Sequence, residues 1–223
     1  MRQRKTMTKK QKKEIMAEIV ERLKLVYPEA TCALEAGGSP WRLLVMARLS
    51  AQCTDARVNI VCRELFGVYP TLDALADAPL QSIEDIVRPC GLFRTKADSI
   101  KRACIMLRDE FGGIVPDSMD DLLTLPGVGR KIANLIIGDV YGKPALVADT
   151  HCIRICGRFG MYSIEMKDPT KVEMIMKELI APSEQSDFCH RIVQFGRDTC
   201  SARSPKCNEC PIRDLCGYKN KKA

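Results

Sequence analysis

Four cysteines near the end of the chain, spaced Cys200-x6-Cys207-x2-Cys210-x5-Cys216, have the number and type of side chains that a metal centre needs. Zinc accepts four cysteine ligands, but usually as two closely spaced pairs. This segment has one close pair and two flanking cysteines, which also suits a [4Fe–4S] cluster. The spacing alone favours the cluster and leaves zinc as the alternative. Two disulfides would require an oxidising compartment, typical of small secreted chains.

The segment 125–131, with the sequence LPGVGRK, has the features of a phosphate-binding turn between two apolar helices. Pro126 ends the first helix, and Gly127 and Gly129 can adopt the positive φ angles of a tight reversal. Backbone amides at the start of the second helix would then point at a phosphate, and the helix dipole favours negative charge there. A plain helix–helix turn with no ligand is the alternative. Arg130 adds a positive charge beside the turn.

Lys131 falls in the first turn of that second helix, where the helix dipole disfavours an ammonium group. Only the neutral amine can attack as a nucleophile, so this position is a candidate for covalent chemistry. A surface lysine that hydrates the turn is the alternative. Asp149, in the segment VADTH, precedes another expected helix and is at least an N-cap, a contribution of about 1 kcal/mol. Its carboxylate is also a candidate partner for Lys131 across a cleft, where it would stabilise positive charge on a sugar.

The loop between the first two clustered cysteines contains two further cations, Arg203 and Lys206. They are candidates for a phosphate clamp, or they balance the negative charge of a metal cluster. The net charge of +7 over 223 residues favours a polyanionic partner such as nucleic acid.

Helices must position all of these residues. Apolar side chains recur with helical spacing, and no segment shows the alternation of a strand, so we predict an all-α fold. Ser39, Thr71 and Thr95 are expected N-caps. No run of about 18 apolar residues predicts a membrane span. The expected helices cover about 15–23, 40–51, 97–107, 122–141 with a glycine turn, 149–160, 170–180 and 184–196.

Taken together, these motifs resemble the endonuclease III family of base-excision DNA glycosylases over about residues 15–218. The resemblance rests on LSAQCTD at 49–55, GLF at 91–93, the segments 125–131 and 147–151, and the four-cysteine pattern. It implies a [4Fe–4S] cluster rather than zinc. It also implies two helical lobes flanking a DNA-binding cleft. One is a six-helix barrel, 33–143, with the helix–hairpin–helix motif; the other joins 1–32 to 144–223 and carries the cluster loop, 200–216.

The resemblance further implies a bifunctional enzyme, a DNA N-glycosylase and AP lyase that excises oxidised pyrimidines from double-stranded DNA. Lys131 would be the Schiff-base nucleophile and Asp149 the essential carboxylate. Gln52 matches the residue that fills the gap left by the extruded nucleotide, and Leu92 matches a second wedge. Gly127, Gly129, Arg130, Arg203 and Lys206 are the other expected DNA contacts. We expect a monomer in a reduced cytoplasm, associated with the nucleoid in a bacterium.

Two positions depart from the family pattern. Arg48 stands where the family is mostly apolar, which leaves the local packing open, and Ser204 replaces a basic residue of the cluster loop. The alternative functions are a monofunctional mismatch glycosylase, which typically lacks a lysine at position 131, and a non-catalytic iron–sulfur protein that binds DNA.

Overall fold

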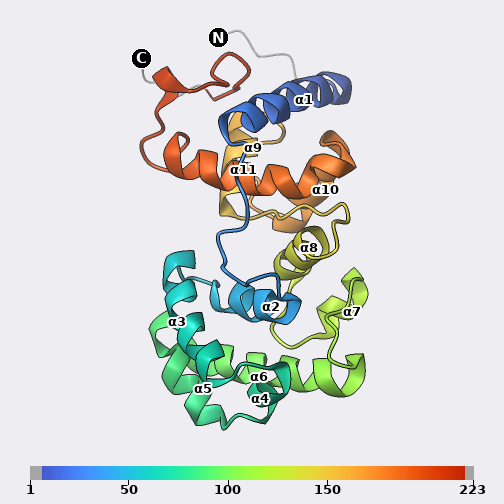
Figure 1. Cartoon of the computed structure of the whole chain (residues 1–223). Helices are drawn as coiled ribbons and strands as arrows, with labels where there is room; N and C mark the ends of the chain where they lie inside the picture. The colour runs from blue at the N-terminus through green and yellow to red at the C-terminus, as the bar shows by residue number, and fades with distance from the viewer. Residues whose placement is uncertain (1–6, 219–223) are drawn as a thin grey trace. The chain divides into compact units, whose positions relative to one another are not determined.

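The computed structural model describes residues 7–218, and within that range the chain is helical and contains no strand, as predicted. The chain divides into two compact units, which Figure 1 shows in sequence colours. Unit 1 joins Met1–Thr31 to Lys143–Ala223, and unit 2 is Cys32–Gly142. The two ends of the expected lobe that joins 1–32 to 144–223, residues 1–6 and 219–223, lie outside the described residues. No helix of the described part is long and apolar enough to cross a membrane.

Unit 2 is built around its longest helix, α6 (Phe93–Phe111), which packs against α2, α4, α5 and the short helix η1. Figure 1 shows α4, α5 and α6 gathered at one end of this unit. The hydroxyl of Tyr69 joins α3 to α5 by donating to Ser82 Oγ at 2.7 Å. The other elements are α2 (Pro40–Leu49), α3 (Asp55–Val68), α4 (Leu72–Asp77), α5 (Leu80–Val87), η1 (Arg88–Cys90), α7 (Met119–Thr124) and α8 (Arg130–Asp139).

The predicted N-caps of this unit had three different outcomes. Thr71 caps α4 as expected, accepting a hydrogen bond from the amide of Ala74 at 3.1 Å. Ser39 precedes α2, but its side chain makes no capping bond. The prediction for Thr95 was wrong, because α6 begins two residues earlier, after Leu92 turns the backbone at φ 48°. A residue in the left-handed conformation breaks the preceding geometry without any side-chain cap.

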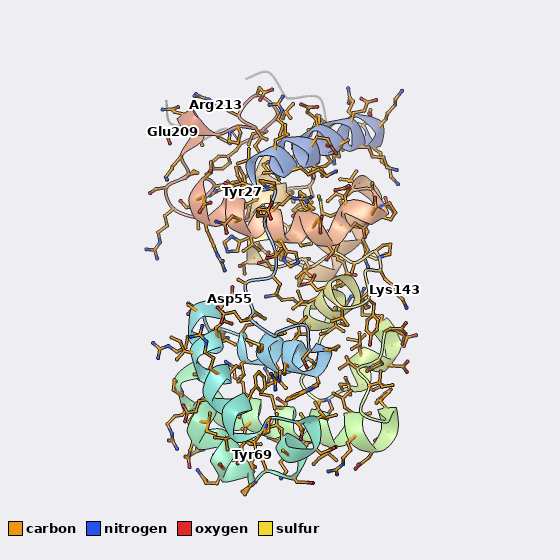
Figure 2. The ribbon with its side chains drawn as sticks, viewed as in Figure 1. Tyr27, Asp55, Tyr69, Lys143, Glu209 and Arg213 are labelled. Atoms are coloured by element: carbon orange, nitrogen blue, oxygen red, sulfur yellow. The ribbon has the colours of Figure 1, made fainter. Side chains whose placement is uncertain are left out.

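In unit 1, α1 (Lys9–Val26) packs against α10 (Pro169–Leu179) and α11 (Gln185–Asp198), and α9 (Thr150–Phe159) packs against α11. The short helix η2 (Pro182–Glu184) lies between α10 and α11, and η3 (Cys207–Glu209) follows α11. Tyr27, labelled in Figure 2, follows α1 and stacks edge-on against Phe195 of α11 at 6.4 Å between ring centroids. Arg22 of α1 donates to both carboxylate oxygens of Asp214, at 2.6 and 3.0 Å. The N-terminal helix thereby holds the end of the cysteine-containing segment.

Candidate active site and cluster site

The glycine hairpin connects α7 to α8 within unit 2. Gly127 has a φ of +78°, as predicted for a tight reversal, and Val128 is buried beneath the turn. The prediction of positive φ for Gly129 was wrong: this residue is the N-cap of α8, with an extended backbone at φ −108°. Apart from Gly129 itself and its chain neighbours, no residue has a heavy atom within 4 Å of the position that a Cβ would take on Gly129. The start of α8 is therefore open to an approaching ligand.

Arg48 supports the hairpin from the end of α2. Its Nε donates to Ser99 Oγ of α6 at 2.8 Å. A Cβ on Gly127 would lie only 2.5 Å from that Nε and 2.8 Å from the Cβ of Ser99. The presence of Arg48, where the family pattern is mostly apolar, thus has a structural explanation, because its side chain fills the space under the turn.

The two residues expected to do chemistry belong to different units. Lys131 is the second residue of α8 and is exposed. Asp149 is the N-cap of α9 and accepts a hydrogen bond from the amide of Cys152 through Oδ1 at 2.8 Å, which confirms the predicted cap. This bond fixes the direction of a partly exposed carboxylate at the start of a helix.

Gln52 and Leu92 share an unusual backbone. They are the non-glycine residues with positive φ between positions 7 and 218, at 56° and 48°. Such residues are uncommon outside Asn and Asp, and the strain persists only where surrounding structure imposes it. Both side chains are exposed, and Leu92 retains 61% of its accessible surface. Leu92 is therefore not a core residue.

The four clustered cysteines of unit 1 line one cavity, together with Arg158, Phe195 and Tyr218. Figure 2 labels two residues of this segment, Glu209 and Arg213. Among the described residues, no three thiol, imidazole or carboxylate groups converge as closely as a single metal ion requires. Burial raises the pKa of Cys210, and the thiols of the other three cysteines act in the same direction. Four thiols that line one cavity without converging on a single point fit a multi-atom cluster.

Arg158, in α9, is a buried charged residue beside the cysteine cavity that sequence reasoning missed. It is 6% exposed, and its Nη1 donates to Cys200 Sγ at 3.2 Å and to the carbonyl of Ser201 at 2.7 Å. Its Nη2 donates to the carbonyl of Ala202 at 2.8 Å, and the guanidinium lies 4.8 Å from the ring centroid of Tyr218. A buried guanidinium in contact with the Cys200 sulfur favours negative charge on that sulfur. Its sequence signal is a charged residue inside an otherwise buried stretch of helix.

Arg203 and Lys206 lie in the same loop, but both side chains are exposed. A backbone hydrogen bond closes this loop: the amide of Lys206 donates to the carbonyl of Thr199 at 2.9 Å. The amide of Ser204 donates to the hydroxyl of Ser201 at 3.2 Å. Two cations thus project from a loop whose backbone is fixed.

Comparison with known proteins matches two family models. Residues 45–182 match the HhH-GPD superfamily of base excision DNA repair proteins, and residues 200–216 match the iron–sulfur binding domain of endonuclease III. Endonuclease III of Synechocystis sp. is 43% identical over 92% of this chain and 93% of its own length. Endonuclease III of Escherichia coli is 36% identical over 92% and 95%.

Solved structures agree with the sequence relatives. A non-covalent endonuclease III–DNA complex superimposes with a TM-score of 0.86 at 39% identity, covering 92% of this chain and 94% of that one. A trapped covalent endonuclease III–DNA intermediate gives the same TM-score and identity, with 92% and 95% coverage. A thermostable thymine-DNA glycosylase, at 22% identity and a TM-score of 0.83, shares the fold.

These matches confirm the predicted all-α fold, the [4Fe–4S] cofactor and the bifunctional glycosylase and AP lyase activity. The four cysteines of the cavity fall within the matched iron–sulfur segment, and the hairpin and Asp149 fall within the matched repair domain. The chain belongs to the endonuclease III family, within the HhH-GPD superfamily of base excision DNA repair proteins.

Proposed function

We propose that Lys131 is the nucleophile of this DNA glycosylase and AP lyase, and that Asp149 is its essential carboxylate. The observation that carries the proposal is the position of Lys131, an exposed amine one residue inside the helix that follows the glycine hairpin. A phosphate held by that turn brings the neighbouring sugar within reach of the amine. The covalent endonuclease III–DNA intermediate among the similar structures supports covalent chemistry at the matching fold.

The reaction proceeds in two stages. The lone pair of Lys131 Nζ attacks the sugar C1′, and the electrons of the C1′–N bond leave with the base, which takes up a proton. Loss of the amine proton and opening of the sugar ring give a Schiff base. The Schiff base acidifies the C2′ proton, and its removal expels the 3′ phosphate by β-elimination. Water then releases the enzyme from the cleaved strand.

Asp149 contributes electrostatic stabilisation and forms no covalent bond with the substrate. Positive charge develops on the sugar as the base departs, and a preorganised carboxylate stabilises it. The hydrogen bond from Cys152 to Oδ1 holds the carboxylate at 2.8 Å from a backbone amide, so little reorganisation is needed. The same group can take part in proton transfer to the amine.

The remaining site residues bind DNA. We propose that Gly127, Gly129 and Arg130 hold the phosphate backbone without reading sequence. Gln52 and Leu92 fill the space left when the damaged nucleotide turns out of the duplex. Unit 2 then corresponds to the barrel lobe and unit 1 to the cluster lobe, with DNA bound by both.

The cluster loop adds a further DNA contact through Arg203 and Lys206. Cys200, Cys207, Cys210 and Cys216 would hold the [4Fe–4S] cluster, whose contribution is to fix this loop. We propose oxidised pyrimidines as the substrates, a monomer as the active form, and the cytoplasm, or the nucleoid of a bacterium, as the location.

Borohydride trapping on duplex DNA with an abasic site tests the nucleophile. We expect a covalent adduct with the unchanged protein and none with Lys131→Gln. Lys171→Gln is a matched control, because Lys171 is also an exposed lysine in the first turn of a helix, α10; it should trap normally. An adduct that persists in Lys131→Gln would overturn the assignment, as would the absence of any adduct with the unchanged protein.

A further inference from the structure

Lys96 of α6 is fully buried, with no accessible surface. Its Nζ donates to the carbonyl of Leu49 at 2.8 Å and to the carbonyl of Cys90 at 2.8 Å. Burying an amine is unfavourable unless its hydrogen bonds are made inside the protein. An apolar side chain would fill this space without that penalty, so the lysine has a role beyond filling volume.

The two carbonyls belong to the last residues of two different helices. Each of these helices is followed by a loop that contains an expected wedge residue. Leu49 is the last residue of α2, and Gln52 follows three positions later. Cys90 is the last residue of η1, and Leu92 follows two positions later. Lys96 therefore joins the starts of both loops through one nitrogen atom.

The same two loops hold the strained backbone described above. Gln52 and Leu92 keep positive φ angles, which require support from neighbouring structure. Burial lowers the pKa of Lys96, as expected for an amine removed from water. The hydroxyl of Ser99 accepts from Arg48 and donates to the carbonyl of Lys96 at 3.0 Å, so the network continues to the residue beneath the hairpin.

We propose that Lys96 is a positioning residue that fixes the Gln52 loop and the Leu92 loop relative to each other, so that both side chains enter the duplex together. The inference rests on the wedge roles under the proposed function. Lys96 acts through the loops and contacts neither the base nor the sugar. Its contribution is needed only where a nucleotide must leave a stacked helix, and a single strand makes no such demand.

The test compares two rates for each variant: excision of an oxidised pyrimidine from a duplex, and cleavage of a single-stranded oligonucleotide with an abasic site. The ratio of the rates is independent of the fraction of folded enzyme. We expect Lys96→Met to lower the ratio by about tenfold to a hundredfold, the scale of a small misplacement of groups around a reacting centre. Gln52→Ala and Leu92→Ala should lower the same ratio, and adding Lys96→Met to Leu92→Ala should lower it little further.

Lys101→Met is the matched control. Lys101 is also a lysine of α6 whose Nζ donates to a backbone carbonyl, but that carbonyl belongs to Ala78, between α4 and α5. This variant should keep the ratio of the unchanged enzyme. If Lys96→Met gives no folded protein, Lys96→Gln decides the question: its side chain is shorter and keeps an N–H donor, so it should give an intermediate ratio.

The outcomes separate this inference from the proposed function. Equal loss of both rates in the Lys96 variants would show a merely structural role and overturn the inference. An unchanged ratio in those variants, with lowered ratios for Gln52→Ala and Leu92→Ala, would also overturn it and leave the wedge roles intact. Unchanged ratios in all of these variants would remove the wedge roles and the inference together.

Discussion

The side chain of Arg48 occupies the space that any side chain on Gly127 would need. A Cβ at Gly127 would lie 2.5 Å from Arg48 Nε, and the arginine is held there by its 2.8 Å hydrogen bond to Ser99 Oγ. The geometry of the hairpin is thus set by a contact between α2, α6 and the turn, and two glycines in one turn have different tasks. Gly127 is required by φ and by space, whereas Gly129 leaves the helix start uncovered.

Gly127→Ala should destabilise unit 2 and weaken DNA binding. Positive φ disfavours alanine by about 1 kcal/mol, and the clash with Arg48 adds overpacking of about 1–3 kcal/mol. Thermal unfolding and DNA titration measure the two effects. Gly129→Ser is the control, because serine is a favoured N-cap and no residue other than its chain neighbours lies within 4 Å of the added Cβ. Gly129→Ser should keep the stability of the unchanged protein. If it weakens DNA binding without lowering stability, the phosphate lies at the backbone amide of residue 129.

Asp149→Asn should separate the capping role of this residue from its chemical role. Asparagine caps a helix about as well as aspartate, so the bond to the amide of Cys152 and the stability should persist. The negative charge is lost, and we expect glycosylase activity to fall by about a hundredfold or more. Asp168→Asn is the matched control, since Asp168 caps α10 by accepting from Thr170 and Lys171. Equal activities of the two variants would argue against a catalytic carboxylate at position 149.

Arg158→Met should weaken retention of the cluster. The substitution keeps much of the volume but removes the donors to Cys200 Sγ, Ser201 and Ala202. Each lost bond from a charged donor destabilises the loop by about 1.5–3 kcal/mol. The rate at which the iron–sulfur absorption disappears under a chelator measures the effect, and it should rise severalfold or more. An unchanged rate would show that the arginine does not stabilise the cluster.

Arg203 and Lys206, the exposed cations of the loop between Cys200 and Cys207, should affect DNA binding and not cluster retention. Replacing Arg203 and Lys206 by glutamine should leave the cluster absorption intact and weaken binding to damaged and undamaged duplexes alike. If each side chain neutralises one phosphate, the slope of log affinity against log salt falls by about 2 for the double variant. Measuring affinity at several salt concentrations gives that slope. An unchanged slope would favour their alternative role of balancing the charge of the cluster.

Local patterns in the sequence predicted most of the helices, though not α3 or α5, together with the hairpin turn and the cap formed by Asp149, because each depends on residues within one or two turns. The same patterns gave the wrong start for α6, since the left-handed backbone of Leu92 has no sequence signal of its own. Lys96 was missed for a different reason. Its two acceptors are backbone carbonyls, one of them 47 residues away, and any residue can supply a carbonyl.

Alkaline pH should destabilise the protein through its buried thiols. Burial raises the pKa of Cys104 from its usual 9.0 to about 12, and burial likewise raises that of Cys62 to about 12. Between pH 9 and 12 the unfolded chain releases these protons while the folded protein keeps them. Stability is therefore complete below pH 9 and falls as pH rises, by up to about 1.4 kcal/mol per pH unit for each thiol.

Denaturant unfolding of Cys104→Ala across this range checks the assignment, because the variant lacks one titrating thiol and should lose stability less steeply than the unchanged protein. Ile100→Val is the control: it truncates a side chain of the same helix that is 1% exposed. It should lower stability by about 1 kcal/mol at every pH and leave the slope unchanged. Parallel slopes for the unchanged protein and Cys104→Ala would show that this thiol does not contribute to the alkaline loss.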